Sequence, residues 1–386
     1  MTDLVKNDGQ YIANTYARFN LQIKRGKGAI FYDFDGKKYI DLTSGIGVNS
    51  FGVSDKIWQK AVKKQLKTLQ HTSNLYYTKP CVDLAKLLCE KTGLKKVFFA
   101  NSGAEANECA IKTARKYAVD KKGEEYFNII TLKDSFHGRT ITTLSATGQD
   151  HYHELFNPLT TGFLYAEKNF ESVEKLVKEN KVAGIMLEII QGEGGVIPLD
   201  KEFLTKVQEL CKKEDILLII DEVQTGNGRT GKLYAYMNYG LSPDIVTTAK
   251  GLGGGLPIGA CMFNEKTEKV LGYGEHGSTF GGNPVSSSGA VSILERLTEE
   301  FLQEVNKKSK IIFDFFKDKT GVKSITGLGL MIGIKTVKPV KEVIKECMAS
   351  GVLCLSAKDK LRLLPPLNIK EKDLIKALSV IEKALG

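Results

Sequence analysis

The chain has 386 residues, of which 42% are hydrophobic and 26% charged, as in a globular protein with one large core or two or three domains. Its net charge of +10 comes from lysines that are spread along the chain among acidic residues, so we expect no nucleic-acid partner. No apolar run is long enough to span a membrane, and the N-terminus lacks the apolar stretch of a signal peptide. Seven cysteines without Cys-x-x-Cys spacing argue against disulfides and zinc, so we expect a cytoplasmic protein without a metal site.

A β-hairpin over 30–40, with its turn at Asp35-Gly36, is the first predicted element. The middle of the chain alternates short apolar runs, rich in β-branched and aromatic residues, with amphipathic stretches. The predicted strands are 97–100, 126–131, 185–190, 216–220, 245–248 and 258–263, and two of the predicted helices are 104–120 and 201–213. This alternation predicts an α/β fold whose mostly parallel sheet carries helices on both faces and binds ligands at the carboxyl ends of its strands.

The last hundred or so residues have a different pattern. Two long helical patterns cover 286–318 and 338–350, and short strands are predicted at 331–334 and 361–364. These elements predict a smaller α+β domain, separated from the first by the glycine-rich stretch 272–282.

A strand, a tight turn and a helix N-terminus follow one another at 97–107. Ser102 and Glu105 have the spacing of a capping box, and Gly103 allows the backbone to approach another group closely. The free N–H groups and the positive end of the helix dipole would suit an anion such as a phosphate. An ordinary helix cap is the alternative that the spacing alone leaves open.

A carboxylate and a lysine end two neighbouring predicted strands. Asp221 follows 216–220, and Lys250 follows 245–249 and precedes a run of glycines. Burial of that lysine would lower its pKa and make it an amine nucleophile able to attack an aldehyde. If the aldehyde is pyridoxal phosphate, Asp221 is the carboxylate that would keep the pyridine nitrogen protonated. A buried ion pair between the two side chains is the competing interpretation.

The stretch 226–231 matches the Gly-x-Gly-x-x-Gly pattern of dinucleotide-binding loops. We reject that function because no long amphipathic helix follows and no acidic residue ends a strand about 20 residues later. A nicotinamide-dependent oxidoreductase is therefore a distant alternative.

Six motifs occur in one order along the chain. They are Asn-Ser-Gly-Ala-Glu-Ala-Asn at 101–107, Ser-Phe-His-Gly-Arg-Thr at 135–140, Glu-Ile-Ile-Gln-Gly-Glu-Gly-Gly at 188–195, Asp-Glu-Val-Gln-Thr-Gly at 221–226, Thr-Ala-Lys at 248–250 and His-Gly-Ser-Thr-Phe-Gly-Gly-Asn-Pro at 276–284. The set resembles the class III aminotransferases, from Tyr11 to about Leu367. The resemblance implies the pyridoxal-phosphate-dependent transferase fold of type I. It also implies an N-terminal segment, 1–45, that joins the small domain, a large cofactor-binding domain, 46–275, and a small C-terminal domain, 276–386.

The resemblance assigns a cofactor role to several residues. Lys250 would hold pyridoxal 5'-phosphate covalently and move the proton during transfer, and Asp221 would bind the pyridine nitrogen. Phe136 would stack on the ring, and Gln224 would lie near its phenolic oxygen. The remaining residues expected at the cofactor are Ser102, Gly103 and Ala104 at the phosphate, Glu222 and Val223 beside Asp221, and Thr279, which would reach the phosphate from the partner subunit of a homodimer with shared active sites.

The resemblance also assigns substrate-binding residues. Arg139 would bind a substrate carboxylate through two parallel hydrogen bonds, and Ser278 and Tyr16 would lie beside the substrate. Glu193 would neutralise Arg362 for one substrate and release it for the other. A structural surface pair is the alternative interpretation of Glu193 and Arg362.

The expected reaction is the transfer of a terminal amino group from N2-acetyl-L-ornithine to 2-oxoglutarate. Ornithine, succinylornithine, 4-aminobutyrate and succinyl-diaminopimelate are alternative donors that the motifs separate poorly. One departure from the family lies at the rim of the site. The family usually has a Gly-His-x-His-Pro-like stretch that begins where Gly52 stands, whereas Val-Ser-Asp-Lys follows here at 53–56. His151 and His153 have no other candidate ligand nearby and are interpreted as loop residues rather than metal ligands.

Overall fold

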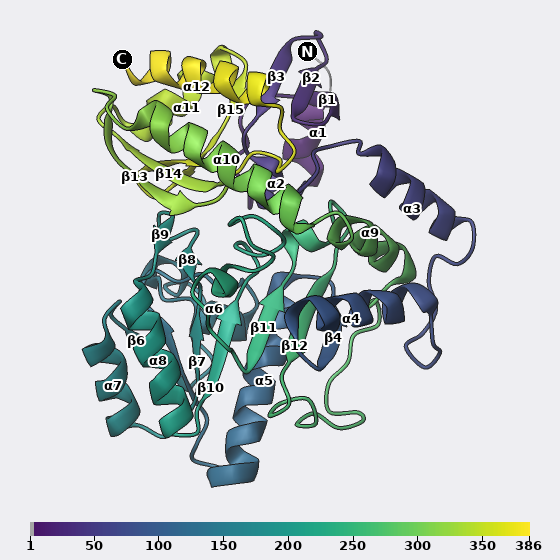
Figure 1. Ribbon diagram of the computed structural model, residues 1–386, viewed down its shortest axis with the longest axis vertical. Helices are drawn as coiled ribbons and strands as arrows, with labels where there is room; N and C mark the ends of the chain where they lie inside the picture. Colours follow the sequence, from purple (N-terminus) through teal and green to yellow (C-terminus); the bar gives the residue numbers. More distant parts are fainter. Residues whose placement is uncertain (1–3) are drawn as a thin grey trace.

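A seven-stranded sheet forms the centre of the computed structural model, which describes residues 4–386 (Figure 1). In spatial order its strands are β4 (Lys96–Ala100), β12 (Gly259–Phe263), β11 (Ile245–Thr248), β10 (Leu217–Asp221), β7 (Val182–Leu187), β5 (Asn128–Leu132) and β6 (Phe163–Ala166). Only β12 runs antiparallel to its neighbours, and the other pairs are parallel. The predicted mostly parallel α/β sheet is therefore confirmed.

Both faces of this sheet are covered. Along β10, Leu217 and Ile219 belong to one hydrophobic cluster, whereas Leu218 and Ile220 belong to the other. The first cluster includes helix α5 (Gly103–Lys122), which contacts five strands of the sheet. The second includes residues of α4 (Lys79–Thr92), α7 (Phe170–Glu179) and α8 (Lys201–Lys213). Burial on both sides explains why the strands read as continuous apolar runs.

Two smaller sheets lie above the central one in Figure 1. The first consists of β13 (Val322–Leu328), β14 (Met331–Thr336), β17 (Lys360–Leu363) and β16 (Leu355–Ala357), with helices α10 (Glu299–Phe316), α11 (Val340–Ala349) and α12 (Glu371–Leu385). The second consists of β1 (Ile23–Lys27), β2 (Ile30–Asp33), β3 (Lys38–Asp41) and β15 (Val352–Leu353). In the second sheet β3 and β15 pair in parallel, and this pairing supports the proposed union of the N-terminal segment with the small domain.

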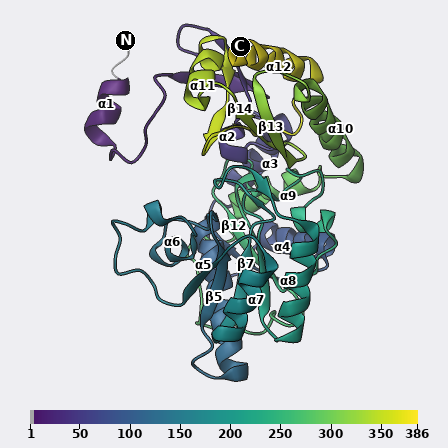
Figure 2. The same cartoon turned by 90° about the vertical axis from the view of Figure 1, so that its left-hand side faces the viewer.

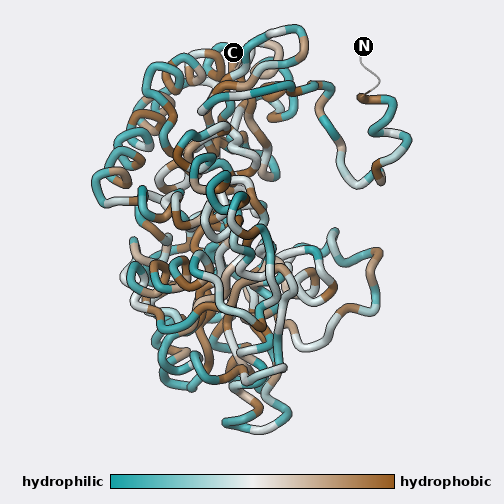
Figure 3. The backbone as a smooth tube through the Cα atoms, turned by 90° about the vertical axis from the view of Figure 1, so that its right-hand side faces the viewer, coloured by the Kyte–Doolittle hydropathy of each residue, from teal (hydrophilic) through white to brown (hydrophobic). Residues whose placement is uncertain are grey.

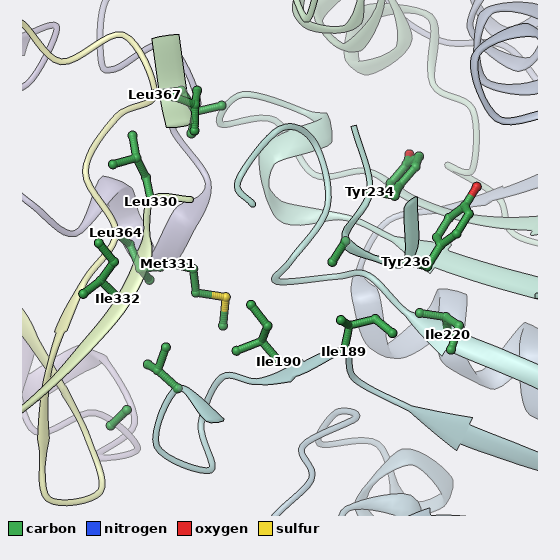
Figure 4. Close-up of a cluster of buried hydrophobic side chains, with 14 of the residues drawn as sticks. Ile189, Ile190, Ile220, Tyr234, Tyr236, Leu330, Met331, Ile332, Leu364 and Leu367 are labelled. Carbon is green, nitrogen blue, oxygen red and sulfur yellow. The ribbon is translucent and has the colours of Figure 1, made fainter. Parts of the chain in front are cut away.

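Apolar side chains connect the central sheet to the C-terminal sheet. Ile190 lies next to Met331 in this buried cluster, and Ile189 lies beyond it beside Ile220 (Figure 4). A short ribbon of β8 (Ile190–Gln191) and β9 (Ile197–Pro198) contacts β13. Figure 3 shows the apolar segments running through the interior of the body, with hydrophilic stretches mostly outside.

Two of the predicted elements are wrong in their bounds. The single helix predicted over 286–318 is two helices, α9 (Pro284–Leu294) and α10. The Thr298 hydroxyl accepts a hydrogen bond from the Phe301 N–H at 3.3 Å, and this cap starts a second helix. The strand predicted over 185–190 is shifted, because β7 ends at Leu187 and Ile190 already belongs to the ribbon. The hairpin turn is confirmed, with Gly36 at φ +83°.

The N-terminal helix α1 (Leu4–Tyr11) stands apart from the body in Figure 2 and buries none of its residues. The remaining elements are α2 (Ser44–Gly47), α3 (Lys56–Leu66), α6 (Ile141–Ala146), η1 (Asp150–Tyr152), η2 (Ala235–Asn238) and η3 (Lys250–Leu252). No helix within residues 4–386 is long and apolar enough to cross a membrane.

Candidate active site

A cavity of about 410 Å³ lies at the carboxyl ends of the central strands. Its walls come from the N-terminus of α5 and from the segments that follow β5, β10 and β11. It brings together these predicted site residues: Ser102, Gly103, Ala104, Phe136, Arg139, Asp221, Val223, Gln224 and Lys250. Most of the residues that the sequence predicts at the cofactor therefore share one pocket.

The N-terminus of α5 forms one end of the cavity. Ser102 is its N-cap and accepts the Glu105 N–H at 3.2 Å, while Glu105 accepts the Asn101 N–H at 2.7 Å. A Cβ atom on Gly103 would lie 2.7 Å from the Val223 side chain, so only glycine keeps this approach open. The first N–H groups of the helix remain available to an anion in the cavity.

Asp221 is held by side chains to which the sequence analysis gave no role. Its Oδ2 accepts a hydrogen bond from Asn107 Nδ2 at 2.8 Å and lies 2.8 Å from His137 Nδ1, and its Oδ1 accepts the Val223 N–H at 2.9 Å. Asn107 in turn accepts the Thr247 hydroxyl at 2.6 Å. Asn107 and His137 both lie inside motifs recognised in the sequence, but nothing in their spacing pointed to Asp221. The network fixes the orientation of a carboxylate that is 3% exposed.

Lys250 begins η3 with φ +40°, an uncommon conformation for a residue with a side chain. Asn227 Nδ2 donates to the Thr248 hydroxyl at 2.9 Å and to the Ala249 carbonyl at 3.2 Å, which ties the preceding backbone down. Burial lowers the pKa of Lys250, although the Glu193 and Asp221 carboxylates act in the opposite direction. Such a lysine deprotonates more readily than an exposed one.

The alternative of a buried Asp221–Lys250 ion pair is wrong. Among residues 4–386, the side chain found beside the Asp221 carboxylate is His137 rather than Lys250, and Lys250 forms no ion pair. Lys250 is therefore available for chemistry rather than held by a salt bridge.

A turn with strained backbone angles lies close to Lys250. The four residues of α2 all have positive φ, namely Ser44 at 48°, Gly45 at 62°, Ile46 at 64° and Gly47 at 74°. Each non-glycine residue in this left-handed region costs about 1–2 kcal/mol. Just after this turn, the Ser50 hydroxyl donates to the Gly251 carbonyl at 3.1 Å, next to Lys250. The backbone strain therefore lies beside the reactive group.

Glu193 and Arg362 form the pair that the resemblance implies. Arg362 Nη1 donates to Glu193 Oε1 at 2.6 Å and to Gln224 Oε1 at 3.2 Å. Burial favours a higher pKa for Glu193, but the Arg362 guanidinium outweighs it and holds the pKa below its usual range. The Arg362 side chain is only 4% exposed and that of Glu193 is 27% exposed, so the arginine end of the pair is buried.

Two further glutamates are buried near the cavity. Glu188 lines it and accepts the Phe136 N–H at 2.9 Å and the Gly192 N–H at 3.3 Å. Burial raises its pKa to about 7. Burial also raises the pKa of Glu222 to about 7, but that side chain accepts the Thr225 hydroxyl and the Tyr236 N–H and does not line the cavity. The predicted cofactor residue Glu222 is thus directed into the protein.

Besides Glu222, five predicted residues do not line the cavity of the single chain: Glu193 and Arg362, which reach it through Gln224, and Tyr16, Ser278 and Thr279. Tyr16 is 74% exposed and contacts Arg18, whose guanidinium carbon lies 5.3 Å from the ring centre. The Ser278 hydroxyl accepts a hydrogen bond from Asn101 Nδ2 at 3.1 Å, and Thr279 is exposed. Neither Ser278 nor Thr279 lines the pocket, so this part of the predicted site is not assembled within one subunit.

The glycine pattern at 226–231 has a structural role. Arg229, in its middle, is buried and donates to the carbonyls of Leu330 and Pro365 in the C-terminal part of the chain. The next helical element is the short η2 rather than a long helix. The loop therefore has no helix N-terminus to receive a pyrophosphate, as the sequence analysis expected.

The cavity residues fit pyridoxal phosphate. The helix N-terminus beside Gly103 suits the phosphate, and the fixed Asp221 carboxylate suits a protonated ring nitrogen. Phe136 and Val223 supply apolar surfaces for the ring, and Lys250 is the amine for the aldehyde. The phosphate, the ring nitrogen, the ring faces and the aldehyde thus each have a matching partner in one cavity.

The chain matches known proteins over nearly its whole length. The family described as Aminotransferase class-III matches residues 11–385. The acetylornithine aminotransferase of Haemophilus ducreyi is 51% identical over 100% of this chain and 99% of that protein. The acetylornithine aminotransferase of Methanocaldococcus jannaschii is 46% identical over 96% of this chain and 94% of that protein.

Solved structures agree with these relatives. The N-acetylornithine aminotransferase of Stenotrophomonas maltophilia has a TM-score of 0.85 at 34% identity, covering 98% of each chain. The ornithine aminotransferase of Toxoplasma gondii, described with partial occupancy of PLP at its active site, has a TM-score of 0.95 at 31% identity, covering 99% of this chain and 94% of that one. The chain therefore belongs to the class III aminotransferases, a family of pyridoxal-phosphate-dependent transaminases.

Proposed function

We propose that this aminotransferase moves the terminal amino group of N2-acetyl-L-ornithine to 2-oxoglutarate. The products are N-acetylglutamate 5-semialdehyde and L-glutamate, and the reaction belongs to arginine biosynthesis. The names of the relatives at 51% and 46% identity support this donor. Ornithine, succinylornithine and 4-aminobutyrate remain alternative donors within the same family.

One observation carries the proposal: the site has two arginines in different electrostatic states. Arg139 is exposed at the cavity, whereas Arg362 is buried and paired with Glu193. Arg139 binds the carboxylate that each substrate presents. Arg362 stays neutralised while the acetylated donor is bound and becomes available for the second carboxylate of 2-oxoglutarate or glutamate. Two unlike substrates can then use one cavity in turn.

Lys250 and Asp221 are the catalytic residues of the proposal. When bound, pyridoxal phosphate supplies an electron sink that stabilises negative charge on the substrate carbon carrying the amino group. Lys250 holds the cofactor between turnovers, and as a free amine its Nζ accepts the proton from that carbon. The pKa lowered by burial favours this unprotonated form. Asp221, oriented by Asn107 and His137, keeps the ring nitrogen protonated.

The phosphate is bound by Ser102, Gly103 and Ala104 of one subunit and by Thr279 of its partner, so the active unit is a homodimer. Exposed apolar side chains mark surfaces that bind other proteins, and several large ones in the single chain are more than two-thirds exposed, which supports this assembly. They are Tyr11, Tyr16, Leu75, Tyr76, Tyr77, Leu155 and Tyr273. All seven cysteines are free, which supports the expected cytoplasmic location.

An absorbance spectrum of the purified protein tests the proposal. The visible band of the lysine-bound cofactor should fall when N2-acetyl-L-ornithine is added and return when 2-oxoglutarate follows. If only ornithine or 4-aminobutyrate lowers the band, the cofactor site stands and the proposed donor is wrong.

A Lys250→Ala variant is the matched control for that spectrum. It should lack the band after cofactor is added and lose at least the ~10²–10⁴-fold acceleration that a general acid–base group contributes. A variant that kept the band or the activity would contradict the role of Lys250.

A further inference from the structure

Arg139 lies against two aromatic rings that also contact each other. Its guanidinium carbon is 4.9 Å from the ring centre of Tyr152 and 5.7 Å from that of Phe136. The two rings meet edge to face, with their centres 5.6 Å apart. Tyr152 is the last residue of η1 and was given no role by the sequence motifs.

No ion pair of Arg139 is found among residues 4–386, and its contacts in the site are those with the two rings. A long exposed side chain without fixed partners loses conformational freedom when it binds a ligand, and that loss weakens binding. Aromatic faces attract a guanidinium and restrict it without using its N–H donors. The donors of Arg139 therefore stay free for a carboxylate.

The position of Tyr152 relative to Phe136 is fixed by hydrogen bonds. Gln149 Nε2 donates to the Ser135 carbonyl at 3.0 Å, and the Tyr152 N–H donates to the Gln149 carbonyl at 3.0 Å. One residue later, His153 Nε2 lies 2.9 Å from the Leu144 carbonyl. The segment that carries Tyr152 is thus tied to the segment that carries Phe136 and Arg139.

We propose that Tyr152 is a positioning residue for substrate carboxylates, because its ring and that of Phe136 hold the Arg139 guanidinium ready to bind them. The proposal rests on the proposed function of Arg139 as the carboxylate clamp. It predicts that Tyr152 affects the binding of both substrates, since each presents a carboxylate to Arg139 in its own half-reaction. The hydroxyl of Tyr152 plays no part, so phenylalanine should replace it.

The experiment compares Tyr152→Leu, Tyr152→Phe and Arg139→Lys holoenzymes. KM and kcat are measured for N2-acetyl-L-ornithine and for 2-oxoglutarate, together with the inhibition constant of glutarate, an unreactive dicarboxylate. In Tyr152→Leu, both KM values and the glutarate constant should rise about two- to fivefold with kcat nearly unchanged, as expected for the loss of one cation–π contact. Tyr152→Phe should behave like the natural protein.

The outcomes separate this inference from the proposed function. If Arg139→Lys raises KM about tenfold or more while Tyr152→Leu leaves KM and the glutarate constant unchanged, the clamp stands and the role of Tyr152 is overturned. If Tyr152→Leu lowers only kcat, or if Tyr152→Phe is as defective as Tyr152→Leu, positioning through the ring is also overturned. If Arg139→Lys has no effect on KM, the clamp itself is wrong, and the inference about Tyr152 falls with it.

Discussion

The inner half of the cavity, formed by Asn107, His137, Asp221 and Lys250, differs from its outer rim, where Tyr16, Ser278 and Thr279 were predicted. The inner residues come from α5 and from segments that follow central strands, and hydrogen bonds of 2.8 Å fix the Asp221 carboxylate. Tyr16 and Thr279 of the rim are exposed and do not line the cavity. The single chain therefore assembles the inner half of the predicted site but not its rim.

Mixing two inactive variants would test this difference most directly, and it has the largest expected effect. Lys250→Ala removes the amine, and Thr279→Glu places a negative charge where the proposed partner subunit meets the phosphate. In a mixed dimer one site has both defects and the other has neither. Unfolding and refolding the two variants together should restore about a quarter of the natural activity, because half of the dimers are mixed and each has one intact site.

Each variant refolded alone is the control and should stay inactive. Mixing Lys250→Ala with Asp221→Ala should restore nothing, because both residues act within the same subunit. Absence of recovery in the first mixture, with dimers present by sedimentation, would place Thr279 outside the partner's site.

The Glu193–Arg362 pair lies between the inner half and the rim, and removing the charge of Glu193 tests its proposed role as a switch. In Glu193→Gln, the Arg362 guanidinium loses the carboxylate that lies 2.6 Å away. The half-reaction with N2-acetyl-L-ornithine should slow about tenfold in kcat/KM, the effect of losing a hydrogen bond between charged groups. The half-reaction with L-glutamate, which uses the released arginine, should change little. Stopped-flow absorbance measures each half-reaction separately.

Glu167→Gln is a matched control, because it also removes a carboxylate from an ion pair. The pair of Glu167 with Lys133 is exposed, and its loss should leave both half-reactions unchanged. Equal slowing of both half-reactions in Glu193→Gln would contradict the proposed switch.

The smallest expected effect concerns stability and pH at the inner half. Burial raises the pKa of Glu188 to about 7, above its ordinary value near 4.5. Between these values the folded protein binds the proton more tightly than the unfolded chain, so the free energy of unfolding falls as pH rises. Glu188→Gln cannot titrate, and its Tm should fall about 2–4 °C less than that of the natural protein between pH 5 and pH 8.

Glu124→Gln, at an exposed position, should keep the pH dependence of the natural protein. Calorimetry at matched cofactor content measures both variants. A Glu188→Gln variant with an unchanged slope would show that the buried carboxyl group does not titrate in this range.

Much of the fold and of the inner half follows from local sequence patterns. Apolar runs locate the buried strands, and the polar residues at their carboxyl ends locate Asp221 and Lys250, because parallel strands bring those ends to one edge. The capping box at Ser102 locates the helix end that suits an anion. These features depend on residues that are close together in the sequence, so one amino-acid sequence is enough to predict them.

The remaining features depend on contacts between distant residues. Asn107 lies 114 positions from Asp221, and only the packing of α5 on β10 brings them together. Tyr152 meets Arg139 through a folded loop that carries no periodic signal. The break between α9 and α10 was missed because the apolar pattern continues across it, whereas the Thr298 cap decides where the second helix starts.

The parallel pairing of β3 with β15 has a consequence for biosynthesis. Ile40 is paired with Val352, which the ribosome adds more than 300 residues later. At about 5–20 residues per second, the N-terminal hairpin waits roughly 15–60 s for its last strand. During that time the apolar face of the hairpin remains exposed. Chaperones that act during translation should therefore bind mainly to the N-terminal part of the polypeptide.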